Sequence, residues 1–310
     1  MLDAAQRFWD SLAEIHWLPI LLAMLCHLAK LACTSRAWRN ILAAAYPEAR
    51  VKWRRIFAAY VSGVGVNAIV PARGGDVLRI ALAHRAIPGS SYTTIVSSTL
   101  VLTIVDSSIA LALFGWALTQ GVLPSVDVLP SLPSFDYGWL FAGGRFSNAA
   151  LLAIGLLISV LVGWIWVRWR AFQARVAQAF AVLHPPTRYL RTVAGWQLAD
   201  WTLRLTTIWL FLGAFGIEQS LRNVVLVQVT QSLATLVPAT PGGIGTEQAF
   251  VVYVFRAADI ARSTLLAFSV GMKLVLTVVN VVVGFTAIAL TLRTFRFRGA
   301  APAPPDEAAA

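Results

Sequence analysis

The stretch Val237-Pro-Ala-Thr-Pro-Gly-Gly-Ile-Gly-Thr-Glu247 interrupts an apolar region and decides how the rest of the chain is interpreted. Apolar residues precede it over Asn223–Leu236 and follow it over Gln248–Phe255. Proline removes a backbone donor and clashes with the preceding helical turn, and glycine adopts dihedrals that other residues avoid. An unwound backbone inside an apolar region is tolerated where it lines a wet cavity or is buried in protein. The stretch therefore predicts a break between two helices within a membrane.

A shorter version of the same pattern lies upstream, at Val70-Pro-Ala-Arg-Gly-Gly-Asp76. Both stretches begin Val-Pro-Ala and continue with a pair of glycines and then an acidic residue. Interrupted segments in corresponding halves of a secondary transporter mark its substrate site. We therefore expect the function of this chain to lie where the two breaks meet.

The composition is that of an integral membrane protein. Of the 310 residues, 58% are hydrophobic and 13% are charged, whereas soluble domains carry roughly 25% charged residues. The formal net charge of +11 would suggest nucleic acid as the partner of a soluble chain. Here the arginines cluster between apolar runs, which the positive-inside rule explains. We expect the chain to lie in a bilayer and to bind no nucleic acid.

The two cysteines and the N-terminal residues add little. Cys26 and Cys33 lie in one apolar segment without metal-ligand spacing. We interpret both as small buried hydrophobes and expect neither a metal nor a cofactor. Residues 2–17 place apolar side chains at helical spacing, which predicts a short amphipathic helix on the membrane surface. No basic segment precedes the first long apolar run, so no secretory signal is predicted.

Five apolar runs are long enough to cross a bilayer, and the segments beside the breaks are too short. The long runs are residues 18–34, 92–118, 149–167, 193–215 and 264–292. By contrast, the fifteen residues of Ile56–Val70 reach roughly 22 Å at about 1.5 Å per residue, short of the roughly 30 Å hydrocarbon core. The two breaks therefore predict helical hairpins at about 56–87 and 223–255.

The distribution of charges decides how these segments are threaded. Cations cluster at 36–55, 168–191 and 293–298, whereas the 119–147 segment carries two aspartates against one arginine. If each hairpin enters the membrane and returns to the same face, every basic cluster falls on the cytoplasmic side, as the positive-inside rule requires. The N-terminus is then outside, the C-terminus is inside, and the 36–55 segment is a cytoplasmic loop of a protein in the cell membrane.

The predicted fold is an all-α polytopic membrane protein. It has about five full transmembrane helices and two re-entrant helical hairpins that enter from opposite faces, in an inverted repeat. We expect a single transmembrane domain over residues 1–298. Residues 299–310 are rich in Ala and Pro, which predicts a disordered tail.

The two broken stretches also carry a family resemblance. The residues concerned are Asn67, Pro71-Ala-Arg73-Gly-Gly-Asp76 and Arg79 at the first break, and Pro238, Pro241-Gly-Gly-Ile-Gly245 and Glu247 at the second. In this order and spacing they resemble the lysylphosphatidylglycerol synthase transmembrane region, also called the flippase-like domain family, over nearly the whole chain. Family members often carry a Glu-Arg pair before the acid of one span. This chain has Leu102-Thr-Ile-Val-Asp106 there, so only Asp106 matches.

The resemblance implies a bacterial or archaeal membrane protein that handles lipids. The best-known members move aminoacylated phosphatidylglycerol between leaflets and carry a separate soluble synthase domain. Because the last span of this chain leads into a predicted tail, we expect no lipid aminoacylation by this polypeptide. A separate lipid-modifying enzyme is a candidate partner.

The residues at the two breaks are of the kinds that could bind a lipid headgroup. A bare phosphate cannot cross hydrocarbon, so a translocase must supply polar cover along the path. Arginine grips phosphate bidentately, and backbone N–H groups at helix N-termini can point at an anion. The predicted headgroup-binding residues are Asn67, Pro71, Arg73, Gly74, Gly75, Asp76, Arg79, Pro238, Pro241, Gly242, Gly243, Gly245, Glu247 and Lys273.

A polar network is predicted among the spans. Its residues are Asp106, Asp200, Arg204, Thr277 and Asn280. A charge at a helix centre costs roughly 2.5–3.5 kcal/mol, so Asp106, Asp200 and Lys273 are candidates to pair across the bundle. Structural interpretations stay open: Arg73, Asp76 and Arg79 as a salt-bridged knot, Lys273 paired to an acid as glue, and Asp200 with Arg204 as a local pair. His27 and His84 are assigned no role.

Three functions remain open on the sequence. The first is a translocase, or lipid-binding transport protein, for a phospholipid or lipid-linked anionic headgroup. The second is a membrane enzyme acting on a lipid-linked substrate such as a polyprenyl lipid or glycolipid, and the third is an accessory subunit that docks such an enzyme. The chain has no His-Glu-x-x-His motif and no Ser or Cys nucleophile with a nearby His, so no catalytic residue is assigned. We favour the translocase.

Overall fold

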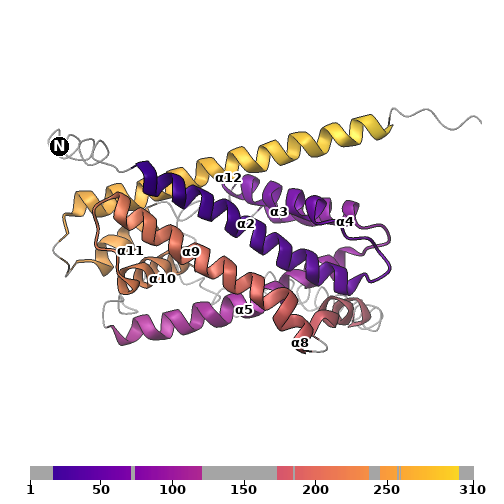
Figure 1. Cartoon of the computed structure of the whole chain (residues 1–310), viewed down its shortest axis with the longest axis horizontal. Coiled ribbons are helices and arrows are strands. Elements are labelled where there is room, and N and C mark those ends of the chain that lie inside the picture. Colours follow the sequence, from indigo (N-terminus) through magenta and orange to yellow (C-terminus); the bar gives the residue numbers. More distant parts are fainter. Residues whose placement is uncertain are drawn as a thin grey trace, which may run out of the picture.

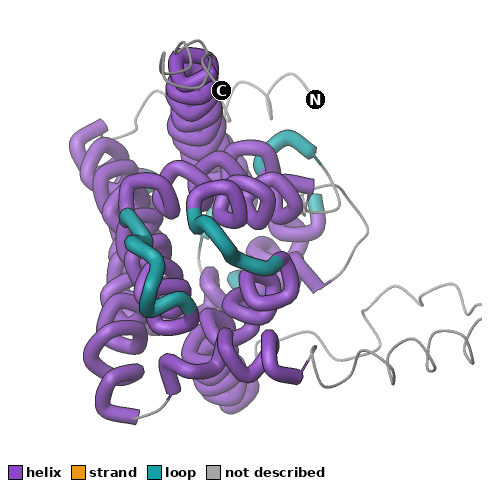
Figure 2. The backbone as a smooth tube through the Cα atoms, turned by 90° about the vertical axis from the view of Figure 1, so that its right-hand side faces the viewer, coloured by secondary structure: helices purple, strands orange, loops and turns teal. Residues whose placement is uncertain are grey.

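The computed structural model describes residues 17–70, 74–120, 173–183, 186–236, 245–256, 258 and 260–299. Every regular element in these ranges is a helix (Figures 1 and 2). In chain order they are α2 (Trp17–Ala45), α3 (Trp53–Asn67), α4 (Gly74–Ala86), α5 (Tyr92–Thr119), η2 (Phe180–Leu183), α8 (Pro186–Tyr189), η3 (Leu190–Ala194), α9 (Gly195–Ala214), α10 (Leu221–Leu236), α11 (Thr246–Val254) and α12 (Arg262–Gly299). The predicted surface helix before Trp17, the predicted span at 149–167 and the predicted tail after Gly299 lie outside the described residues.

Three of the predicted spans coincide with helices that are long and apolar enough to cross a membrane. These are α2, α5 and the Arg262–Thr291 part of α12. The predicted span at 193–215 corresponds to α9, a helix of 20 residues that carries Asp200 and Arg204. The all-helical class and the membrane character of the fold are thus confirmed.

The prediction of a loop at 36–55 is wrong over most of its length, because most of these residues are helical. Helix α2 continues past the predicted end of the span to Ala45, and α3 begins at Trp53. The helix persists because Trp38, Ile41 and Leu42 follow helical spacing and are almost completely buried. Only Tyr46–Lys52 connects the two helices.

Helix α2 lies at the centre of the bundle and packs antiparallel to α9. Thr34 donates a hydrogen bond to Asp200 near the middle of the pair. Further along, Asn40 Nδ2 donates to the carbonyl oxygen of Thr192 at 2.6 Å. Helix α5 joins the same core, since Trp38 Nε1 donates to Ser98 Oγ at 2.8 Å. These contacts hold the long helices side by side and leave polar groups between them.

Helices α3 and α4 form a short antiparallel hairpin, as the first break predicts. Gly63 faces both Arg79 and Gly75, and Gly75 lies against Asn67, so the pairing runs in opposite directions along the two helices. A Cβ atom at Gly75 would lie 2.1 Å from the carbonyl oxygen of Gly63, a distance that excludes any side chain. The glycines thus allow the backbones of α3 and α4 to approach closely. At the open end of the hairpin, Arg54 of α3 and Arg85 of α4 line the same groove.

Helices α10 and α11 form the second hairpin and open toward the other end of the bundle (Figure 1). They share a buried cluster that includes Val224, Val227 and Val251 with Phe211 of α9 and Phe268 of α12. A short turn with Gly216 at a φ of 67° leads from α9 into this hairpin. The α3–α4 hairpin therefore opens at the end of the bundle where α2 finishes, and the α10–α11 hairpin opens at the opposite end, where α9 finishes.

The two ends differ in charge. Helices α2 and α12 finish, and α5 and α9 start, at the end that Figure 2 faces. Its cations include Arg36, Arg39, Arg50, Lys52, Arg54, Arg55, Arg85, Arg175, Arg188 and Arg191. Among described acids, Glu48 alone accompanies them. We call this the basic end. The opposite end carries Arg222, Arg256 and Arg262 with Glu218.

Helix α12 crosses the first hairpin at a pair of glycines. A Cβ atom at Gly284 would lie 2.6 Å from the Cα of Gly65, and one at Gly65 would lie 2.8 Å from the carbonyl oxygen of Asn280. Small residues at such crossings let two backbones approach closely in a membrane, where packing replaces the hydrophobic effect between helices. This crossing fixes α3 against the longest helix of the bundle.

We expect Gly284→Leu to lower the free energy of unfolding by about 1–3 kcal/mol, the usual cost of overpacking. Gly115→Leu is the matched control, since no atom lies within 4 Å of a Cβ atom built there. The unfolding midpoint of each variant in detergent provides the measurement. Equal midpoints for both variants would contradict the close crossing of α3 and α12.

Candidate functional site

The tip of the first hairpin brings together an amide, a carboxylate and a cation. Asn67, the last residue of α3, accepts a hydrogen bond from the backbone N–H of Gly75 at 2.8 Å and donates one to Asp76 at 3.0 Å. Asp76 also lies 3.4 Å from Nε of Arg79. The first N–H groups of α4 lack partners within the helix, so Asn67 satisfies one of them from the neighbouring helix. The guanidinium of Arg79 lies 5.7 Å from the Trp38 ring centroid.

The second hairpin holds the same three kinds of group. Glu247, at the start of α11, is 3% exposed. It accepts a hydrogen bond from Gln231 Nε2 of α10 at 3.1 Å and forms an ion pair with Lys273 of α12 at 3.0 Å. Gly245 precedes the helix at a φ of 90°, a conformation that suits glycine.

Each hairpin therefore carries what we call a tip triad: Asn67, Asp76 and Arg79 in the first, and Gln231, Glu247 and Lys273 in the second. In both, the amide comes from the first helix and the carboxylate from the first turn of the second helix, where the helix dipole favours a negative charge. They differ in the source of the cation. Arg79 belongs to the same helix as Asp76, whereas Lys273 reaches in from α12.

A third polar group joins α2, α5 and α9 between the hairpins. Arg204 Nη2 lies 3.1 Å from Asp200 and 3.4 Å from Asp106, and its guanidinium lies 4.4 Å from the Trp201 ring centroid. Thr34 donates to the other oxygen of Asp200. Unpaired charges at the centre of a spanning helix cost roughly 2.5–3.5 kcal/mol each, so this shared pairing explains how three charges are accommodated here.

A cavity of about 210 Å³ lies between the third polar group and the second tip triad. Its lining residues are His27, Lys30, Arg204, Thr207, Ile208, Gln228, Gln231, Met272 and Leu276, from α2, α9, α10 and α12. We call it the central cavity. Arg204 belongs to the third polar group and Gln231 to the second tip triad, so the cavity connects the two.

The central cavity is electrostatically suited to an anion. Among the described residues, no carboxylate lines it. Lys30 has no ion-pair partner among the described residues, and Oε1 of Gln228 is buried there without a hydrogen-bond partner. His27 Nε2 lies 2.8 Å from Asn280 Oδ1 and ties α2 to α12 beside the cavity. The Lys30 amine thus attracts an anion to this small polar space, and the unsatisfied Gln228 oxygen can accept from a hydrogen-bond donor on the same ligand.

The predicted site residues fall into separate groups. Asn67, Gly75, Asp76 and Arg79 meet at the first tip, where Gly74 begins α4. Glu247 and Lys273 meet at the second, beside Gly245. The local Asp200–Arg204 pair is present and also includes Asp106. Asn280 contacts His27, and Thr277 is half-buried. Pro71, Arg73, Pro238, Pro241, Gly242 and Gly243 lie outside the described residues.

Lys273 is paired to an acid, as one structural interpretation expected, but the expected pairing of Lys273 with Asp106 or Asp200 is wrong. Lys273 pairs with Glu247, and Asp106 and Asp200 both pair with Arg204 instead of with Lys273. His27, which the sequence assigned no role, is buried and bonded between two helices. Within the described ranges the two tip triads do not touch each other. The sequence-based idea of a single pocket formed directly by both breaks stays a prediction.

Sequence reasoning missed four residues of the central cavity and its surroundings: Lys30, Thr34, Gln228 and Gln231. One signal could have found the last two. They lie three residues apart, on one face of the Val- and Leu-rich helix α10, where a polar side chain is costly unless it has a partner. Lys30 gave a similar signal as a cation within the apolar run of α2.

Comparison with known proteins gives a family. Neither the curated proteins nor the solved structures contain a match to the chain. The model of one protein family, described as Lysylphosphatidylglycerol synthase TM region, matches residues 4–284. Because this match covers most of the chain, and because three described helices are long and apolar enough to span a bilayer, the chain belongs to the lysylphosphatidylglycerol synthase TM region family and is a membrane protein.

Proposed function

We propose that this protein binds the anionic headgroup of a phospholipid or lipid-linked molecule inside its helical bundle and moves it between the leaflets of the cell membrane. The observation that carries the proposal is the central cavity. It places Lys30, unpaired within the described ranges, beside Arg204, which also pairs with Asp106 and Asp200, and it lies within a bundle of apolar helices. No carboxylate is among its described lining residues. The family is consistent with a role in handling membrane lipids.

The proposal places the basic end of the bundle in the cytoplasm. The positive-inside rule favours this orientation, with the N-terminus outside and the C-terminus inside. Helices α2, α5, α9 and α12 then cross the bilayer, together with the 149–167 segment. The α3–α4 hairpin enters from the cytoplasm and the α10–α11 hairpin enters from outside, because each opens at its own end. The tip triads support an inverted repeat, since each hairpin has an amide on its first helix and a carboxylate in the first turn of its second helix, although the cation comes from the hairpin in one and from α12 in the other.

The polar groups inside the bundle would act by replacing the water around a crossing headgroup. A phosphate transferred bare into hydrocarbon loses far more free energy of hydration than packing can return. Lys30 and Arg204 would bind its oxygens, and Oε1 of Gln228, which lacks a partner, would accept a hydrogen bond from a hydroxyl or amine of the headgroup. Glu247 would hold Lys273 until the headgroup arrives, and could accept a hydrogen bond from a cationic headgroup amine. None of these steps changes the lipid chemically, so we propose a transporter and not an enzyme.

We predict that Glu247→Gln and Arg73→Ala each abolish leaflet exchange of a fluorescent phospholipid in proteoliposomes. The first change removes the carboxylate that orients Lys273, and the second removes a cation of the first break. Glu218→Gln and Arg222→Ala are the controls, since both alter exposed residues outside the tip triads. Normal exchange in Glu247→Gln and Arg73→Ala protein that still inserts and folds would reject the assigned site.

The same proteoliposomes separate translocation from the alternatives. A translocase exposes the labelled lipid to a quencher in the other leaflet and returns it chemically unchanged. Recovery of a modified lipid would identify an enzyme instead. No exchange without an added enzyme, together with restored lipid handling in its presence, would identify an accessory subunit.

We predict that Lys30→Met slows leaflet exchange of an anionic phospholipid at least about tenfold while lowering the free energy of unfolding by less than about 3–5 kcal/mol, the cost of removing one member of a buried ion pair. Lys30 has no ion-pair partner among the described residues, so its loss relieves a desolvation penalty and removes only a longer-range attraction to Asp106 and Asp200. Leaflet exchange and the thermal unfolding midpoint are measured on the same preparation. A marked fall in stability with unchanged leaflet exchange would show that Lys30 is structural.

A further inference from the structure

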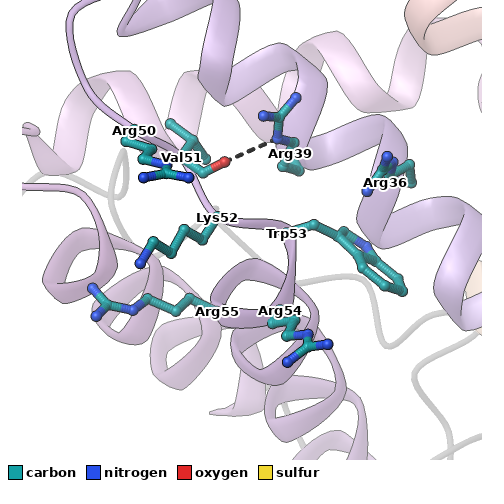
Figure 3. A pocket seen from close by; sticks show the side chains of 8 residues that line it. All are labelled: Arg36, Arg39, Arg50, Val51, Lys52, Trp53, Arg54 and Arg55. Atoms are coloured by element: carbon teal, nitrogen blue, oxygen red, sulfur yellow. Dashed lines mark hydrogen bonds between the residues drawn. The ribbon is translucent and has the colours of Figure 1, made fainter.

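A second cavity, separate from the central one, lies at the basic end of the bundle. Its volume is about 580 Å³, and Figure 3 shows the side chains around it. The lining residues are Arg36, Arg39, Arg50, Val51, Lys52, Trp53, Arg54 and Arg55. They come from the end of α2, the short connection and the first turn of α3. We call it the rim pocket. Of its described lining residues, six are cations and none is an acid.

The start of α3 makes the rim pocket more positive than its side chains alone. Lys52 occupies the N-cap position, and Arg54 and Arg55 lie in the first turn, which contains no acid. No side chain caps this helix end. Helix N-termini favour anions and disfavour cations, so an anion bound here would interact favourably with both the helix end and the side chains. In the part of the chain that the structure describes, none of the six cations forms an ion pair with a carboxylate.

Two of the cations are held in position by their neighbours. Arg39 Nε donates to the carbonyl oxygen of Val51 at 3.0 Å, as Figure 3 shows. The guanidinium of Arg36 lies 5.3 Å from the Trp53 ring centroid and 6.0 Å from that of Trp196. Cation–π contacts of this kind orient an arginine without neutralising its charge. The pocket is therefore partly preorganised for an anionic ligand.

An apolar groove begins where the rim pocket ends. The groove has a volume of about 1020 Å³ between α3, α4 and α12. Arg54 and Arg55 line both spaces, and Arg85 of α4 joins them at the groove. The walls beyond these arginines are mainly apolar and include Phe57, Leu82, Val283 and Leu290. A cluster of cations thus leads directly into a space that suits a hydrocarbon chain.

We propose that the rim pocket and the groove together form a binding site for one anionic phospholipid, with its phosphate at Arg54 and Arg55 and an acyl chain in the groove. Arginine pairs bind phosphate oxygens bidentately, and basic pockets at the cytoplasmic side of membrane helices suit multiply charged headgroups. Six cations favour a lipid with more than one negative charge, such as one that ends in a phosphomonoester. This inference goes beyond the proposed translocation and does not depend on it.

Charge and shape together favour a lipid over other anionic ligands. A soluble polyphosphate would use the cations but leave the groove empty. An acidic protein segment would need a complementary polar surface, whereas the groove behind the arginines is apolar. A lipid phosphate and a free phosphate could both bind these cations. Only the lipid has an acyl chain that would occupy the groove.

The test uses the full-length protein in phosphatidylcholine nanodiscs with spin-labelled phosphatidic acid as the probe. We expect Arg54→Gln/Arg55→Gln to weaken binding of the probe at least about tenfold. The control, Arg256→Gln/Arg262→Gln, removes two cations from the other end and should bind the probe as the unmodified protein does. Spin-labelled phosphatidylcholine should bind weakly and equally to all three proteins.

A groove variant separates a lipid from a soluble phosphate. Ala287 of α12 lines the groove, and Ala287→Trp would fill it. We expect this variant to lose the spin-labelled phosphatidic acid and to keep any binding of inorganic pyrophosphate. Unchanged binding of phosphatidic acid by Ala287→Trp, or by Arg54→Gln/Arg55→Gln, would overturn the proposal. Because Glu247→Gln leaves the rim pocket intact, it should lose leaflet exchange and still bind the probe, which keeps the two proposals distinguishable.

Discussion

The cost of burying charge in an apolar bundle governs the interior of this protein. Glu247 is almost fully buried, yet it has both an amide and an ammonium group as partners. Arg204 lies between two aspartates from two helices. Each such pair joins segments far apart in the chain, so satisfying the charges also fixes which helices are neighbours. Lys30 departs from this rule among the described residues. An unpaired cation at a polar cavity is therefore the strongest indication of a ligand.

The sequence predicted the coarse fold because hydropathy, helix length and glycine or proline breaks are local signals. The short arm before Pro71 and the breaks themselves predicted both hairpins, and α5 matches its expected span to within about a residue. The partners of the charges could not be predicted in the same way. Gln231, Glu247 and Lys273 come from three helices, and Asp106 is 98 positions from Arg204. The length of α2 was also misjudged, because a run of arginines suggested a loop although Trp38 and Leu42 continued the buried face.

The structure separates two kinds of cationic site. The central cavity is small, enclosed by four helices and bordered by a tip triad. The rim pocket is larger, lies at the basic end and opens into a groove along α3, α4 and α12. The Gly65–Gly284 crossing brings α12 against the first hairpin, and the groove lies between these helices. A lipid held at the rim and a headgroup held in the centre would occupy different depths of the same membrane protein.

The direction in which each hairpin enters the membrane is the central claim, and cysteine labelling tests it most directly. In protein with Cys26 and Cys33 replaced by alanine, single cysteines at Lys52 and Ser90 flank the first hairpin, and single cysteines at Ser220 and Ala258 flank the second. A membrane-impermeant maleimide is applied to oriented vesicles from either side. The account predicts that Lys52 and Ser90 are labelled from the cytoplasmic face only, and that Ser220 and Ala258 are labelled from the outer face only. Labelling of Lys52 and Ser90 from opposite faces would mean that the first hairpin crosses the membrane, and would contradict the account.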